Sequence, residues 1–119
     1  MATDSQLQDK GQGKDIAYCE GSAEDAAKHK LDIYVPKGKT NASLPVLFFI
    51  HGGAWKSGDR SNYVPLGNRY AREGVVTVVP SYRLAPKHPH PAQIEDVAAA
   101  FAWTVRIRFV QTYWFALSV

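Results

Sequence analysis

The residues best suited to chemistry form one short segment, HGGAWKSGDR (residues 51–60), which directly follows the apolar run PVLFFI. Its two adjacent glycines, Gly52 and Gly53, let the backbone turn sharply and approach a ligand closely. Such a turn can direct successive backbone N–H groups at one point, which is what a developing oxyanion needs. A plain Gly-Gly loop with Trp55 buried in the core would also explain the glycines. The additional presence of His51 and of the pair Gly58-Asp59 favours the functional interpretation.

Other residues with reactive or metal-binding side chains have a structural explanation that we prefer. Cys19 lies on an expected first strand with no histidine-containing motif nearby, so we interpret it as a small core residue. His88 and His90 flank Pro89 and could hold a metal ion, but no third ligand follows at a diagnostic spacing. A solvated loop explains them better, and we predict neither a metal site nor a cofactor.

Two further patterns are weak for physical reasons. Glu95 and Asp96 are adjacent on an expected helix, so their side chains point in different directions and form no acid–base pair. Asn41-Ala42-Ser43 matches a glycosylation sequon, which means little without a signal peptide.

Two separate stretches together resemble a known family. FFIHGGAWKSGDR is similar to the HGG-x-W oxyanion-hole loop of α/β-hydrolase esterases and lipases. VVPSYRLAPKHPHPAQIEDVAAAFAW is similar to the stretch that follows the fourth strand of those enzymes. The branch is the hormone-sensitive-lipase-like and carboxylesterase branch, which includes kynurenine-formamidase-like enzymes, and the resemblance covers roughly residues 29–105.

The resemblance implies a role for each residue of the loop. The backbone N–H groups of Gly53 and Ala54 would line an oxyanion hole, with Gly52 shaping the turn. The structural members of the motif would be His51, which is then not the catalytic base, together with Trp55, Gly58 and Asp59. Ser81 and His90 depart from the family pattern, in which Asp and an aromatic residue are common, and we expect both to alter packing without removing chemistry.

The nucleophile of the family is missing from this sequence. No serine lies in a G-x-S-x-G pentapeptide, and Ser57 has Trp55 and Asp59 where the glycines would stand. We therefore expect the N-terminal half of a serine carboxylic-ester hydrolase that acts on small-molecule esters or amides, truncated and not itself competent. The alternatives are an inactive remnant or splice form that acts by binding, a fragment of a formamidase-like amide hydrolase, and a frameshifted or mispredicted gene product.

The apolar patterns indicate the elements that would position the loop. Alternation predicts strands over residues 15–20 and 29–35, continuous apolar runs predict buried strands over 45–50 and 75–79, and helical spacing predicts helices over 61–73 and 91–105. An antiparallel pair followed by strand–helix–strand–helix order predicts the α/β class with parallel strands and crossover helices. By resemblance, this is the N-terminal part of an α/β-hydrolase sheet.

We expect three segments along the chain. Residues 1–14 are predicted to be a disordered lead-in, 15–106 a partial α/β-hydrolase domain, and 107–119 an atypical apolar tail. In the fold that the chain resembles, the strand over 45–50 lies beside the strand that bears the nucleophile. Without that neighbour it would become an edge with unpaired backbone groups, unless the tail adds a strand. Self-association or aggregation is the expected consequence.

Composition excludes several other classes. The 119 residues suit one domain, and a net charge of +3 without any basic cluster argues against a nucleic-acid binder. A single cysteine excludes an internal disulfide framework, and no apolar run approaches the ~20 residues of a membrane span. The polar first fifteen residues do not resemble a secretory signal, so we expect a cytoplasmic location.

Overall fold

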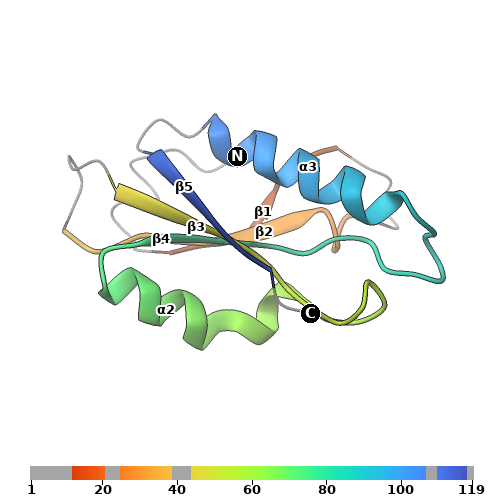
Figure 1. Cartoon of the computed structure of the whole chain (residues 1–119), viewed down its shortest axis with the longest axis horizontal. Coiled ribbons are helices and arrows are strands. Elements are labelled where there is room, and N and C mark those ends of the chain that lie inside the picture. Colours follow the sequence, from red (N-terminus) through yellow and green to blue (C-terminus); the bar gives the residue numbers. More distant parts are fainter. Residues whose placement is uncertain (1–11, 21–24, 39–43, 107–109, 118–119) are drawn as a thin grey trace.

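Two apolar strands, Leu44–Ile50 (β3) and Val76–Pro80 (β4), run parallel inside a five-stranded sheet (Figure 1). The computed structural model describes residues 12–20, 25–38, 44–106 and 110–117. Within these residues the strand order is β1-β2-β4-β3-β5, with β1 at Gln12–Ala17, β2 at Lys30–Tyr34 and β5 at Val110–Leu117. The pairs β1–β2 and β2–β4 are antiparallel, and β3 is parallel to both β4 and β5.

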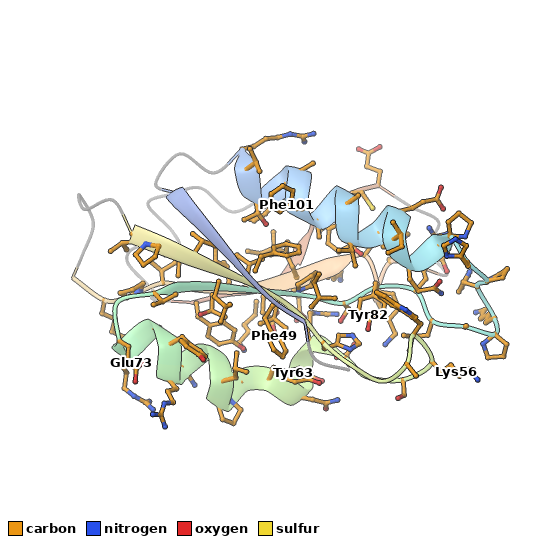
Figure 2. The ribbon with its side chains drawn as sticks, in the orientation of Figure 1. Phe49, Lys56, Tyr63, Glu73, Tyr82 and Phe101 are labelled. Atoms are coloured by element: carbon orange, nitrogen blue, oxygen red, sulfur yellow. The ribbon has the colours of Figure 1, made fainter. Side chains whose placement is uncertain are left out.

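Helices cover both faces of the sheet, which is why the parallel strands β3 and β4 are almost entirely apolar. The helix Ala92–Val105 (α3) lies on one face, and the short 3-10 turn Arg60–Tyr63 (η1) followed by the helix Val64–Arg72 (α2) lies on the other (Figure 1). Successive residues of a strand point to opposite faces. Accordingly, Phe48 packs edge-on against Phe101 of α3, whereas Phe49 contacts Tyr63 below the sheet (Figure 2).

The expected element types are confirmed, with shifts at the ends. β1 begins at Gln12, so the lead-in predicted over residues 1–14 is too long by three residues. Gln12 and Gly13 carry no apolar pattern, yet they pair with Tyr34 and Ile33 of β2, and sequence spacing does not reveal such a pairing. Residues 1–11 and the sequon at 41–43 lie outside the described residues. Cys19 follows β1 rather than lying on it.

The tail decides between two expectations for β3. β5 pairs with β3 from Leu44–Val110 to Ile50–Leu117, so β3 is not an unpaired edge, and the alternative in which the tail adds a strand is confirmed. Sequence periodicity did not reveal this strand because the backbone ladder itself requires no particular side-chain pattern. The free edge on this side of the sheet, within the described residues, therefore belongs to β5.

Among the helices in the described parts of the chain, none combines the length and apolar sequence that crossing a bilayer requires.

Candidate functional site

The loop after β3 lies at the carboxyl end of the parallel strands, as expected, and three consecutive residues in it, as well as Gly58, have positive φ angles. Gly53, Ala54 and Trp55 have φ angles of 124°, 56° and 65°. Gly53 is required here because an added Cβ would lie 2.1 Å from the carbonyl oxygen of Ser57. Ala54 and Trp55 are exposed, so the turn faces outward beyond the sheet.

Hydrogen bonds fix two carbonyl groups of this turn, whereas the successive N–H groups from Gly52 to Trp55 have no acceptor among the described residues. The carbonyl of Gly53 accepts from the N–H groups of Lys56 (3.0 Å) and Ser57 (3.2 Å). The carbonyl of Trp55 accepts from the N–H of Ala85 (2.9 Å), in the loop after β4. Within the described part of the chain, no acceptor takes the N–H of Gly53 or of Ala54. The N–H groups of Gly53 and Ala54 are thus two adjacent donors from which an anionic oxygen could accept hydrogen bonds.

His51 begins the loop and is enclosed by it. The ring is 1% exposed, and its Nδ1–H, in the tautomer assigned from this contact, donates to the carbonyl of Gly52 at 2.8 Å. Burial lowers the pKa of His51, so the imidazole is neutral near pH 7. A Cβ on Gly58 would lie 2.5 Å from His51 Nδ1, which explains why glycine stands at the end of the loop. The ring therefore orients backbone and presents no edge to solvent.

Five aromatic rings form a continuous column from the loop into the core. His51 stacks on Tyr82 at 4.2 Å and faces Tyr63 at 5.9 Å between ring centroids. Trp55 contacts Tyr82 at one end (5.2 Å), and Phe49 contacts Tyr63 at the other (5.0 Å). Tyr82, Tyr63 and Phe49 are labelled in Figure 2. Trp55 remains 37% exposed, so the alternative in which it fills the core is wrong.

Asp59 ties the end of the loop to three other segments. One carboxylate oxygen accepts from the N–H and hydroxyl of Ser61 (3.1 and 2.7 Å). The other accepts from the Ser81 hydroxyl (3.0 Å) and the Lys28 ammonium (3.2 Å). Burial by itself would raise the pKa of Asp59, but the donors on Ser61, Ser81 and Lys28 outweigh it and hold the pKa below its usual range.

Arg60 is the first residue to which sequence reasoning assigned no role. Its buried guanidinium donates to the carboxylate of Asp15 (2.6 Å), the carbonyl of Ala27 (2.8 Å) and the hydroxyl of Ser81 (3.1 Å). Asp32 lies 3.6 Å away. The available sequence signal was a charged residue at the end of the loop segment. Ser81 is fully buried, and its hydroxyl bridges Arg60 and the loop.

Asp96 is the second residue whose role the sequence did not reveal. Its buried carboxylate accepts from the Arg83 N–H (2.9 Å), the Arg83 guanidinium (2.9 and 2.8 Å) and the His29 ring (3.1 Å). Burial alone would raise the pKa of Asp96, but the Arg83 donors lower it overall. The side chain of Glu95 is 64% exposed, which confirms that the two carboxylates diverge. Asp96 thereby fastens the loop after β4, in which Ala85 bonds to the loop after β3.

The remaining candidates show no catalytic arrangement. Cys19 is half-buried against the core, and burial raises the pKa of its thiol. His88 contacts Asp25 at 3.1 Å, His90 is exposed, and no group of three metal-ligating side chains occurs among the described residues. Ser57 is exposed, and its hydroxyl donates only to the Gly53 carbonyl, at 3.4 Å, in the part of the chain that the structure describes.

Comparison with known proteins gives consistent matches. The BD-FAE family model matches residues 31–108. Arylacetamide deacetylase of Oryctolagus cuniculus is 43% identical over 84 residues, which are 68% of this chain and 21% of that protein. Carboxylic ester hydrolase LipN of Mycobacterium tuberculosis is 42% identical over 71 residues, which are 59% of this chain and 18% of that protein. The chain thus spans about a fifth of the length of these curated relatives.

Solved structures give the same result for the fold. Esterase B from Lactobacillus rhamnosis aligns with a TM-score of 0.74 at 28% identity, covering 89% of this chain and 34% of that chain. The hyperthermophilic esterase from the archaeon Pyrobaculum calidifontis aligns with a TM-score of 0.64 at 28% identity, covering 74% of this chain and 29% of that chain.

Proposed function

Because this chain belongs to the BD-FAE family of α/β-hydrolase esterases, we propose that its loop after β3 is the oxyanion hole of a carboxylic-ester hydrolase. The N–H groups of Gly53 and Ala54 are the two donors. The observation that carries the proposal is their geometry: both lie in a left-handed turn, and no acceptor in the described residues takes either of them. The turn also lies where open α/β sheets bind ligands, beyond the carboxyl ends of the strands.

The chemistry follows from where charge appears. When a nucleophile attacks an ester carbonyl carbon, negative charge develops on the carbonyl oxygen, and fixed N–H groups stabilise it without reorganising. In enzymes, the loss of one such donor lowers kcat by about 10²–10³. The role of Gly52 is to shape the turn, whereas Trp55, Gly58 and Asp59 hold the turn in place through the contacts described above. The sequence contains no G-x-S-x-G serine, so the nucleophile is not among these 119 residues.

Two substrate classes, esters and amides, remain candidates. LipN is named a carboxylic ester hydrolase, which favours a small-molecule ester. The rabbit relative is named an arylacetamide deacetylase, which favours an amide. Both substrates pass through a tetrahedral oxyanion, so the same two N–H groups serve either reaction. The cytoplasmic location expected from the sequence also remains a prediction, which fractionation of cells expressing the chain would test.

An anion titration followed by backbone NMR tests the proposal. A methylphosphonate monoester, which mimics a tetrahedral oxyanion, is added to the ¹⁵N-labelled chain. We expect the amide resonances of Gly53 and Ala54 to shift, with Gly38, a left-handed glycine remote from the loop in sequence, as the internal control. The variant Gly53→Ala should lose the response, because its Cβ cannot fit against Ser57. Shifts confined to other amide resonances would contradict the assignment of Gly53 and Ala54 as the oxyanion donors.

A further inference from the structure

The two borders of the sheet are built differently. At the β1 border the pairing with β2 shifts register between Gly13 and Ile16, and Asp15 has a φ of 54°. Two charged residues, Lys14 and Asp15, lie within that irregularity, and both are exposed. A bulge and charged side chains are the features that keep an edge strand from accepting another strand. The β1 border is therefore protected.

The β5 border carries no charged side chain, and its one register shift against β3 lies at its beginning, between Val110 and Thr112. Its sequence, VQTYWFAL over residues 110–117, contains no charged residue, no proline and no glycine. From Pro45–Thr112 to Ile50–Leu117 its pairing with β3 is regular. Among the described residues β3 is its sole strand neighbour, so a row of backbone N–H and C=O groups faces outward along the regular part of the strand, residues 112–117. Such a row is a template for a further strand.

We propose that the strand added there is β5 of a second copy of this chain, paired antiparallel. An antiparallel pair of identical strands is self-complementary, because each strand offers the other the same donors and acceptors about a two-fold axis. With that axis perpendicular to the sheet, both α3 helices lie on one face and both α2 helices on the other. No helix then has to cross the seam, since α3 and α2 cover opposite faces within each copy (Figure 1). The dimer continues the ladder that β3 and β5 already form.

The chain also has a rival apolar surface, which the experiment must separate from the edge. On α3, Ile94 is 50% exposed and Val105 is 48% exposed. Nothing in the structure shows what covers them, so they carry no proposal of their own. They supply the matched control: a lysine on α3 adds the same charge as a lysine on β5 without touching the edge.

Sedimentation velocity of the full 119-residue chain over a range of concentrations tests the dimer. We expect a concentration-dependent monomer–dimer equilibrium for the wild type. Thr112→Lys should raise the dimer dissociation constant about tenfold or more, and Ile94→Lys should leave it unchanged. Gln111→Lys repeats the test on the neighbouring position, and circular dichroism checks that each variant retains its helix and strand content.

Hydrogen exchange of the β5 amides gives a second, independent measurement. Protection of these amides should increase with protein concentration in the wild type and not in Thr112→Lys. A monomer at every concentration would overturn the proposal, as would dissociation by Ile94→Lys alone. Open-ended growth in mass without a dimer would overturn it too. A monomer whose β5 amides are all protected would show that another segment of the same chain covers the edge, and the proposal would again be wrong.

Discussion

Gly58 closes the loop after β3 because no side chain fits at its position. Its φ is 109°, and an added Cβ would lie 2.5 Å from the His51 ring. We expect Gly58→Ala to lower the free energy of unfolding by about 2–5 kcal/mol, the sum of backbone strain and overpacking. Gly38→Ala is the control, since Gly38 has a φ of 75° with nothing within 4 Å of an added Cβ. Urea denaturation measures both, and equal losses would show that the contact with His51 is unimportant.

His51 makes stability depend on pH in a definite direction. Burial lowers its pKa in the folded state, so the unfolded chain binds the proton more tightly. The stability due to the neutral ring is therefore complete above its ordinary pKa of about 6.5 and is lost as the pH falls below that value.

Urea denaturation at about pH 7.5 and about pH 5.5 checks this prediction. The variant His51→Asn keeps a donor for the Gly52 carbonyl but does not titrate, so its stability should change less between the two conditions. The low pKa values of Asp59 and Asp96 affect both proteins alike and only in more acidic solution. An unchanged pH difference in the variant would contradict the assignment.

At the scale of helices and strands, the carboxylate of Asp96 fastens α3 to the loop after β4. Its side chain is 4% exposed and accepts three hydrogen bonds from Arg83. Asp96→Asn replaces an acceptor oxygen by a donor and leaves the Arg83 charge without its partner, so we expect a loss of about 2–4 kcal/mol. The adjacent Glu95→Gln is the matched control, because Glu95 is exposed and lies 3.8 Å from Arg83, a contact of about 0.5 kcal/mol or less. Similar losses of unfolding free energy in the two variants, measured by thermal or urea denaturation, would contradict this anchoring role of Asp96.

Gly67 shows that packing between elements can reverse a local preference. Alanine normally stabilises a helix by about 1 kcal/mol relative to glycine. In α2, however, a Cβ on Gly67 would lie 2.3 Å from the ring of Tyr34 on β2. We expect Gly67→Ala to destabilise the protein by about 1–3 kcal/mol, and the loss should shrink in a Tyr34→Leu background, where the ring is absent. A more stable Gly67→Ala single variant would show that α2 moves away freely.

The elements that could be predicted from sequence are those whose signal is local. The apolar runs of β3 and β4 and the helical spacing of α2 and α3 each require only neighbouring residues. The start of β1 and the whole of β5 depend on a partner strand that sequence spacing does not identify.

The same limit applies to the site. The turn around Gly53 follows from its own residues. The bonds of Arg60 to Asp15 and of Asp96 to His29 join positions 45 and 67 residues apart, which no local pattern encodes.

At the scale of the whole molecule, a donor loop without a nucleophile should show no turnover. We expect the purified chain not to hydrolyse short-chain p-nitrophenyl esters above a boiled control, and not to react with a fluorophosphonate probe. No serine lies in G-x-S-x-G, and the exposed Ser57 has no imidazole partner among the described residues. Stoichiometric labelling of one serine, located by mass spectrometry, would falsify this expectation and require a different nucleophile.

The contacts of Arg60 also constrain the order in which the chain folds. Its guanidinium bonds to residues 45, 33 and 21 positions away, on β1, before β2 and after β4. Contacts of such long sequence separation form late, because the intervening chain must first lose its conformational freedom. The loop that holds Gly53 and Ala54 is adjacent to Arg60 in sequence, so we expect it to become ordered only after β1 and β2 have packed against β4. We therefore expect the two donors to converge late in folding, after the strands that Arg60 joins have assembled.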